Sequence, residues 1–222
     1  MIGEGRYTQG DLAIEPEGCF SLAVGDLNGD SYPDLFAGNE MADQVFINSE
    51  DRSFLDSGGR YGSGPTAGVT IGDMDGDGDL DVVAAGWGDQ GHVWANDTTG
   101  HFTSRFELDT SSLHVHAAEL ADYEGDGDLD VFFAVAGRIC CRNLWINDGT
   151  GVLVPKPNDF GSIGAHGIAV IDLDLDGFLD VILAIGDTVP RPSMIWLGNE
   201  DGFEDSGIRV GEAFSGGIAT GT

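Results

Sequence analysis

Acidic residues recur in four short loops that share one pattern. Each loop spans nine residues and carries carboxylate or carboxamide side chains at positions 1, 3, 5 and 9. A hard divalent cation such as Ca²⁺ takes about six to eight oxygen ligands, which alternating acidic side chains and one backbone carbonyl can supply. The pattern therefore predicts four Ca²⁺ sites, one in each of the segments 26–34, 73–81, 122–130 and 172–180.

The same register assigns the ligands within each loop. The side-chain ligands are Asp26, Asn28, Asp30 and Asp34 in the first loop, Asp73, Asp75, Asp77 and Asp81 in the second, Asp122, Glu124, Asp126 and Asp130 in the third, and Asp172, Asp174, Asp176 and Asp180 in the fourth. The backbone carbonyls at position 7 belong to Tyr32, Asp79, Asp128 and Phe178. A glycine at position 6 supplies the sharp turn in three loops, but the first has Ser31 there, so we expect it to bind most weakly.

The loops allow two other interpretations, which the sequence does not favour. An EF-hand loop ends on a bidentate Glu at its twelfth position between two helices. Here the twelfth positions are Ala37, Ala84, Phe133 and Leu183, and none can bind a metal. Asp-Gly turns without any cation would crowd four acidic groups into nine residues, at a repulsive cost of roughly several kcal/mol per loop.

The elements that position the loops repeat with them. The first aspartates recur at intervals of 47, 49 and 50 residues, a period that suits a four-stranded propeller blade. A short strand-like run precedes each loop, and a more apolar run rich in β-forming residues follows it. A third strand carries an aromatic residue in every repeat, and we expect these residues to pack between blades: Phe46, Trp94, Trp145 and Trp196. A fourth strand begins near Phe54, Phe102, Leu153 and Phe203.

These loops, together with Asn-Asp-Gly turns such as the one at 147–149, resemble the FG-GAP (VCBS) repeats of integrin-α-like β-propellers. The resemblance covers nearly the whole chain. It implies an all-β fold, a β-propeller of four-stranded antiparallel blades, with about four bound Ca²⁺ ions. It leaves function open, because such propellers include adhesion receptors, fungal lectins and lyase-associated domains.

The chain is expected to form one domain, 1–222, with repeats at about 10–54, 55–102, 103–153 and 154–203. Residues 5–9 and 215–221 read as extra terminal strands. Three arrangements follow: a closed four-bladed ring, part of a larger propeller, or a protomer whose terminal strands complete a neighbour's blade. The third would produce a homo-oligomer or filament by head-to-tail pairing, and we expect such self-association.

Composition limits the partners. The chain has 39 acidic and 9 basic residues, for a formal charge of -30, which argues against nucleic acid and favours bound cations. No apolar run approaches the ~20 residues of a membrane helix, so no membrane insertion is expected. The three cysteines, Cys19, Cys140 and Cys141, do not make a disulfide framework.

No catalytic constellation is evident, so we expect a protein that is not an enzyme. His116 and His166 occupy equivalent places in two repeats, where they are expected to lie near the propeller axis or simply to begin a strand. The leading hypothesis is an extracellular or secreted binding, adhesion or assembly module with a protein or glycan ligand. Asn96 begins a glycosylation sequon on a predicted surface turn, which suits that location.

Two further functions remain open. A carbohydrate-binding lectin would use loop carboxylates with the exposed aromatic residues Trp87 and Tyr123. A polysaccharide lyase or hydrolase would need a basic or His-rich cleft, and 9 Lys and Arg residues favour it least.

Overall fold

The computed structural model describes residues 18–48, 53–88, 90–110, 113–136, 143–157, 164–186 and 191–211. Sixteen strands make four antiparallel sheets of four strands in these segments, and each sheet is built from four consecutive strands. The described part of the chain contains no helix, and so no helix that could cross a membrane. The all-β fold of four-stranded blades expected from the sequence is confirmed.

The strands of the four blades follow one pattern. Blade 1 comprises β1 (Cys19–Gly25), β2 (Asp34–Asn39), β3 (Gln44–Asn48) and β4 (Phe54–Asp56). Blade 2 comprises β5 (Thr66–Gly72), β6 (Asp81–Gly86), β7 (Gly91–Asn96) and β8 (Phe102–Leu108). Blade 3 comprises β9 (His114–Ala121), β10 (Asp130–Ala136), β11 (Leu144–Asn147) and β12 (Leu153–Lys156). Blade 4 comprises β13 (Ala165–Ile171), β14 (Asp180–Ile185), β15 (Ser193–Asn199) and β16 (Gly202–Val210).

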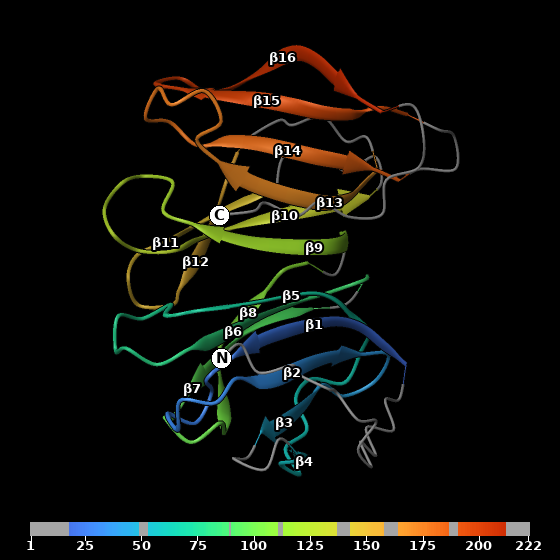
Figure 1. Cartoon of the computed structure of the whole chain (residues 1–222), viewed down its shortest axis with the longest axis vertical. Coiled ribbons are helices and arrows are strands. Elements are labelled where there is room, and N and C mark those ends of the chain that lie inside the picture. The colour runs from blue at the N-terminus through green and yellow to red at the C-terminus, as the bar shows by residue number, and fades with distance from the viewer. Residues whose placement is uncertain are drawn as a thin grey trace, which may run out of the picture.

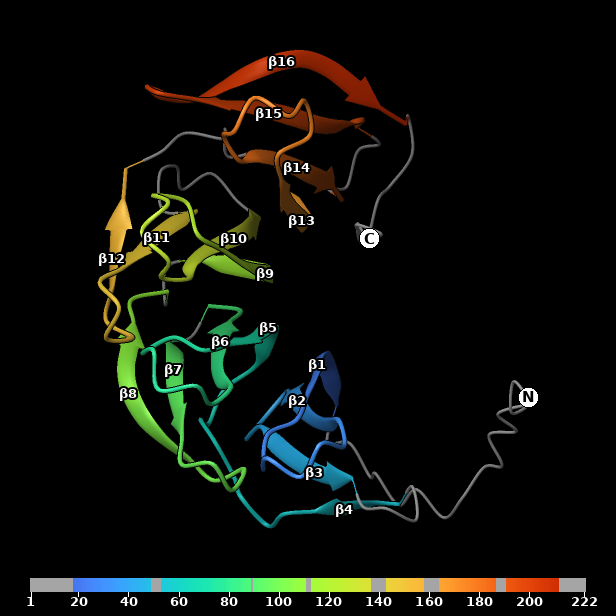
Figure 2. The same ribbon diagram turned by 60° about the vertical axis from the view of Figure 1, so that its left-hand side comes forward.

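The blades follow one another along an arc (Figure 2), with the first strand of each blade on the inner side. Neighbouring first strands contact each other in the order β1, β5, β9 and β13. Within the described residues, no extensive contact joins blade 1 to blade 4. These segments therefore form an open row of blades, and the predicted extra strands at 5–9 and 215–221 lie outside them.

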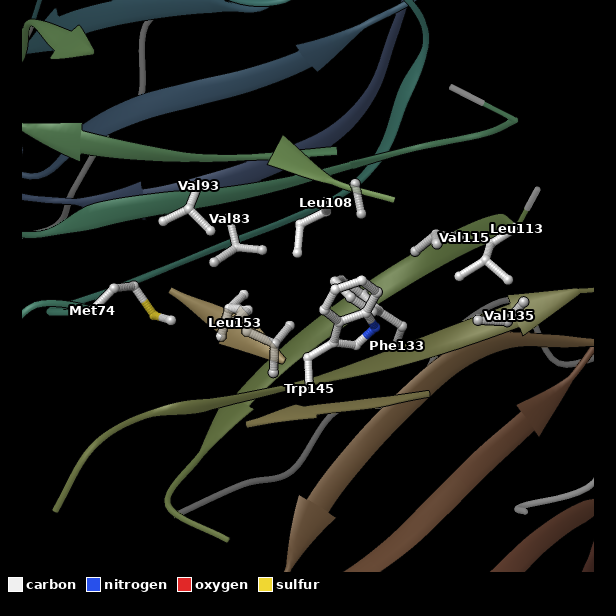
Figure 3. Packing of buried hydrophobic residues seen from close by; sticks show 12 residues of the cluster. Met74, Val83, Val93, Leu108, Leu113, Val115, Phe133, Val135, Trp145 and Leu153 are labelled. Atoms are coloured by element: carbon white, nitrogen blue, oxygen red, sulfur yellow. The ribbon is translucent and has the colours of Figure 1, made fainter. Parts of the chain in front are cut away.

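Three hydrophobic clusters hold the row together, one between each pair of neighbouring blades. The cluster between blades 2 and 3 includes Val83, Val93, Phe133 and Trp145, all buried (Figure 3). The second strands supply much of this core, because both of their faces are covered by neighbouring blades and nearly every residue is apolar.

The aromatic residues expected between blades lie there. Trp94 and Trp145 are buried, and Trp196 packs against the cluster between blades 3 and 4. Phe46 is also buried, in blade 1.

The predicted turn that begins at Asn96 is exposed at Asp97 and Thr98, but Asn96 itself is not a surface residue. The residue is buried at the end of β7, and its side-chain amide donates hydrogen bonds to the carbonyls of Leu27 and Leu80. A glycan replaces one of the two amide hydrogens, so attaching one there would break one of these bonds. Cys19 is a free, exposed thiol, whereas Cys140 and Cys141 lie outside the described residues.

Candidate metal centres

Each acidic loop joins the first strand of a blade to its second strand. The first strands run toward the same edge of the molecule, the left edge in Figure 1, where the loops emerge side by side. The repeat therefore places the four predicted metal centres along one rim.

The aspartate at position 1 organises the backbone of its loop. Asp73 accepts hydrogen bonds from the backbone N–H groups of Gly76 and Gly78, at 2.8 and 3.0 Å. Asp26, Asp122 and Asp172 make the same kind of contact in the other loops. This network curls the chain around the carboxylate, which keeps the acidic side chains of each loop close together.

The aspartate at position 9 is buried and connects the loop to the third strand. The carboxylate of Asp81 accepts hydrogen bonds from the backbone N–H groups of Met74 and Asn96, at 3.1 and 2.9 Å. Asp34, Asp130 and Asp180 repeat this arrangement. Burial raises the pKa of Asp81 to about 6, against the lowering effect of these hydrogen bonds, and nearby Asp75 and Asp77 raise it further. Position 9 therefore has a structural role that the sequence pattern alone did not reveal.

Two residues in every loop have a left-handed backbone. The predicted turn at position 6 is confirmed, because Gly78, Gly127 and Gly177 have φ between 93° and 98°. Ser31 takes the same region at φ 72°, which strains the first loop. Position 4 was missed by the sequence analysis: it holds glycine in three loops but Leu175, at φ 64°, in the fourth.

Loops 2 and 4 bring three carboxylates together. One oxygen from each of Asp73, Asp75 and Asp81 lies within 4.8 Å of the others, and Asp172, Asp174 and Asp180 form the equivalent group. The position-5 residues Asp77 and Asp176 lie outside these groups and instead accept the backbone N–H of position 7. These two loops have clusters that could hold a metal ion.

Loops 1 and 3 are arranged differently in the part of the chain that the structure describes. In loop 3, Glu124 pairs with Lys156 at 3.1 Å and does not join a three-carboxylate group. In loop 1, Asn28 donates a hydrogen bond to Asp30 at 3.0 Å. The predicted ligands of these loops thus share a loop but do not converge as those of loops 2 and 4 do.

Asp75 gives a direct test of whether a cation fits. Its side chain is only 8% exposed, and its Oδ2 pairs with Arg105 at 2.9 Å. Its Oδ1 is buried without a hydrogen-bond partner among the described residues. An unpaired buried carboxylate oxygen is costly, and Asp75 belongs to an all-oxygen group of the kind that Ca²⁺ prefers. The donors of loop 2 therefore fit a hard divalent cation.

The equivalent histidines lie on inner strands, as expected. The first strand of each blade contains a β-bulge six residues before its first loop aspartate, and His116 and His166 occupy two of the four bulges. Their rings stack at 3.9 Å between centroids. Burial, with smaller contributions from His166 and His114, lowers the pKa of His116 to about 4, so this ring is neutral at physiological pH.

The aromatic residues proposed for sugar binding differ in exposure. Trp87 is exposed, as predicted. Tyr123 is partly buried, which corrects the prediction, because its ring stacks on Phe203 and carries the Lys156 ammonium 4.3 Å from its centroid.

The fold and loops define a propeller-type repeat protein with acidic loops that could hold metal ions. The model of the FG-GAP-like repeat matches residues 26–84 and 73–133, which include the first three loops. Residues 26–133 of this chain are thus FG-GAP-like repeats.

Known proteins resemble this chain in sequence and in fold. Human cartilage acidic protein 1 is 27% identical over 209 residues, covering 85% of this chain and 31% of that protein, and the mouse protein is 27% identical over 94% of this chain. The chain thus spans about a third of the length of these curated relatives.

Two solved structures share the fold. An Agrocybe aegerita lectin specific for non-reducing terminal N-acetylglucosamine has a TM-score of 0.53 at 20% identity, over 82% of this chain and 49% of that one. A chain from the complex of BBS1N with ARL6DN has a TM-score of 0.55 at 11% identity, over 86% of this chain and 55% of that one.

Proposed function

We propose that this chain is a non-enzymatic extracellular module for binding and assembly, with blades stabilised by Ca²⁺. The three-carboxylate groups of loops 2 and 4 and the unpaired Oδ1 of Asp75 support a bound cation. The ion would neutralise part of a chain whose formal charge is -30. Extracellular fluid supplies Ca²⁺ at the millimolar level that weak oxygen sites require.

Thermal unfolding with and without Ca²⁺ tests the cation. Because the ion binds only the folded loops, excess EGTA should lower the melting temperature by about 10 °C or more, and Ca²⁺ but not Mg²⁺ should restore it. Asp73→Asn and Asp172→Asn should each reduce the Ca²⁺-induced shift. Asp201→Asn, an exposed acid outside the loops, serves as the control. A melting temperature that EGTA leaves unchanged would show that Ca²⁺ does not stabilise the blades.

The assembly role is supported by the outer face of blade 1, which is the face turned away from blade 2. Leu22 and Val24 on β1 are 57% and 60% exposed. Their counterparts in blade 2, Val69 and Ile71, pack against blade 1, and Val69 is only 8% exposed. The equivalent residues of blades 3 and 4 likewise pack against the preceding blade: Ala118, Leu120, Ile168 and Val170. Blade 1 therefore presents a surface that this repeat elsewhere buries under another blade.

Hydrogen bonds between blades favour a partner blade of the same type. The side-chain amides of Asn96 and Asn147 each donate to a loop carbonyl of the preceding blade, that of Leu27 or Met74, at 2.8 Å. Asn48 occupies the same place in blade 1 and donates to the carbonyl of Pro33 within its own blade. A blade of the same type would cover Leu22 and Val24 and accept the remaining N–H of Asn48. A second copy of this chain, docked head to tail, offers such a blade.

Sedimentation in saturating Ca²⁺ tests this association. The chain should form a head-to-tail oligomer, and the double variant Leu22→Glu and Val24→Glu should sediment as a monomer. The control is Val154→Glu, which places a charge at an exposed position on β12 of blade 3, away from both ends of the row. A wild-type chain that sediments only as a monomer would show that the outer face of blade 1 does not join two copies.

A lectin is the second candidate function, and a specific feature favours it. A groove of about 370 Å³ runs beside loops 3 and 4 and is lined by Tyr123, Glu124, Lys156, Phe178 and Asn199, among others. Aromatic rings beside polar groups can hold a sugar. Binding to a glycan array that is lost in Tyr123→Ala would support a lectin site in this groove. Binding lost in Trp87→Ala instead would place the sugar at that exposed ring.

A further inference from the structure

Three of the five histidines gather at the end of the first strands opposite the acidic loops. His114 and His116 lie at the start of β9, and His166 lies near the start of β13. Six residues of extended chain separate His116 from Asp122, a span of roughly 20 Å. The histidine group is therefore separate from the candidate calcium sites.

Their rings form one continuous cluster. The rings of His116 and His166 are nearly parallel, at an interplanar angle of 11° and a centroid distance of 3.9 Å. The ring of Trp87 lies 5.6 Å from His116 and 6.0 Å from His114. Backbone pairing between Trp87 and His114 holds these two residues together.

The β-bulges explain why two histidines from different blades meet. A bulge inserts one extra residue into a strand and re-aims its side chain, and His116 and His166 are the bulged residues of adjacent inner strands. The corresponding residues of blades 1 and 2 are Phe20 and Ala67, which offer no nitrogen. The β-bulge thus carries a side chain that can bind a metal only in blades 3 and 4, which lie next to each other.

The imidazole nitrogens are available to a ligand. Among the hydrogen bonds of the described residues, none involves the ring of His116 or His166, and both residues are partly exposed. Neutral imidazole binds zinc, copper and nickel ions well, whereas Ca²⁺ prefers oxygen. We propose that His116 and His166, with His114 as a third ligand, bind a divalent ion of the zinc and copper class. Because an imidazole nitrogen binds a metal in the plane of its ring, the two rings would rotate out of their stack to bring their nitrogens onto one ion.

Calorimetric titration of the Ca²⁺-saturated chain with Zn²⁺ tests the site. The wild type should bind one ion, and His116→Ala and His166→Ala should each weaken binding by at least about tenfold, because each removes one of few ligands. The matched control is His101→Ala, an exposed histidine on another turn, which should bind as the wild type does. Equal binding by all four proteins, or no binding by the wild type, would overturn the proposal.

Tryptophan fluorescence provides a second measurement of metal binding that is independent of calorimetry. Cu²⁺ bound at this cluster should quench Trp87, the most exposed of the described tryptophans. Quenching should disappear in His116→Gln and His166→Gln, which keep the size and polarity of the site, and in Trp87→Phe. The Ca²⁺-dependent melting temperature of each variant establishes that it is folded. Quenching that persists in both folded Gln variants would also overturn the site.

Discussion

The side-chain amide of Asn147 donates a hydrogen bond to the carbonyl oxygen of Met74, 2.8 Å away in the acidic loop of the preceding blade. The same amide reaches the carbonyl of Leu129 in its own blade, and its oxygen accepts the backbone N–H groups of Gly149 and Gly151. One buried side chain thus fixes its own turn and attaches its blade to the candidate metal loop of the preceding blade. Loop geometry and blade packing are therefore coupled.

Replacing Asn147 tests this coupling. Asn147→Ala leaves buried backbone groups without partners, so the free energy of unfolding should fall by about 2–4 kcal/mol. Urea denaturation measures the change. Asn199→Ala is the matched control, because its side chain makes a single local bond at an exposed turn, and its effect should stay within about 0.5 kcal/mol. Equal losses in the two variants would contradict the special role of Asn147.

Strain in the first and fourth loops predicts two stabilising substitutions. Ser31 and Leu175 adopt left-handed backbone that costs a residue with a Cβ about 1–2 kcal/mol, part of which glycine recovers. Ser31→Gly and Leu175→Gly should each raise stability by about 0.5–1 kcal/mol, measured by chemical denaturation, and Ser31→Gly should tighten Ca²⁺ binding by loop 1. Leu175 is 86% exposed, so its loss removes little burial.

Gly78→Ser is the reciprocal experiment. A Cβ at Gly78 would meet no atom within 4 Å, so only the φ of 93° opposes the substitution. The variant should lose about as much stability as Ser31→Gly gains. A neutral result for both substitutions would show that the loops relax without cost.

Arg105 is predicted to act in place of a cation. Its guanidinium pairs with Asp75 at 2.9 Å, and Arg105→Gln would leave that largely buried carboxylate to the ion alone. The variant should melt at a lower temperature without Ca²⁺, and its Ca²⁺-induced rise in melting temperature should exceed that of the wild type. Arg209→Gln breaks the more exposed pair with Asp205 and should leave the rise unchanged.

Ionisation of the buried Asp43 carboxyl should make the stability of the fold depend on pH. Burial raises its pKa to about 7, although the backbone N–H of Asn39 and the hydroxyl of Thr66 donate hydrogen bonds to it. The native state therefore keeps a proton that the unfolded chain releases near pH 4, and stability from this group falls as pH rises from about 4 to 7.

Asp43→Asn removes that dependence. Its stability relative to wild type should increase across the same pH interval and level off above pH 7, as measured by urea unfolding at each pH. Because both proteins share all other acids, the difference isolates Asp43. A difference that stays flat from pH 4 to 8 would show that this carboxyl ionises normally in the fold.

The repeat explains what the sequence could predict. Periodic aspartates, apolar second strands and a recurrent aromatic residue fix the strand order of every blade, since each observation is made four times. The turn at position 6 follows from the preference of glycine for positive φ. Asn96 and Asp81 show the limit of this reasoning. Side-chain type alone places Asn96 on the surface and Asp81 on a metal, whereas both side chains are buried and hydrogen-bonded to the backbone.

Contacts between blades determine the burial and the partners of individual side chains, which the repeat pattern does not show. The turn that follows the sequon asparagine is exposed at Asp97 and Thr98, but Asn96 itself is buried, because the preceding blade offers the carbonyl of Leu27. Glu124 matches the ligand pattern, but Lys156 from a strand 32 residues away pairs with it. The stacking of His116 on His166 depends on two bulges, and periodicity does not show where a strand gains a residue.

Among the described residues, extensive contacts join only neighbouring blades, so the free energy of the row is close to a sum of single-blade and neighbour terms. Blade 1 has one neighbour among the described blades, whereas blades 2 and 3 have two. Unfolding should therefore start at blade 1, and the amide hydrogens of β1 and β2 should exchange with solvent before those of β6 and β10. Whatever docks on Leu22 and Val24 would slow that unfolding first.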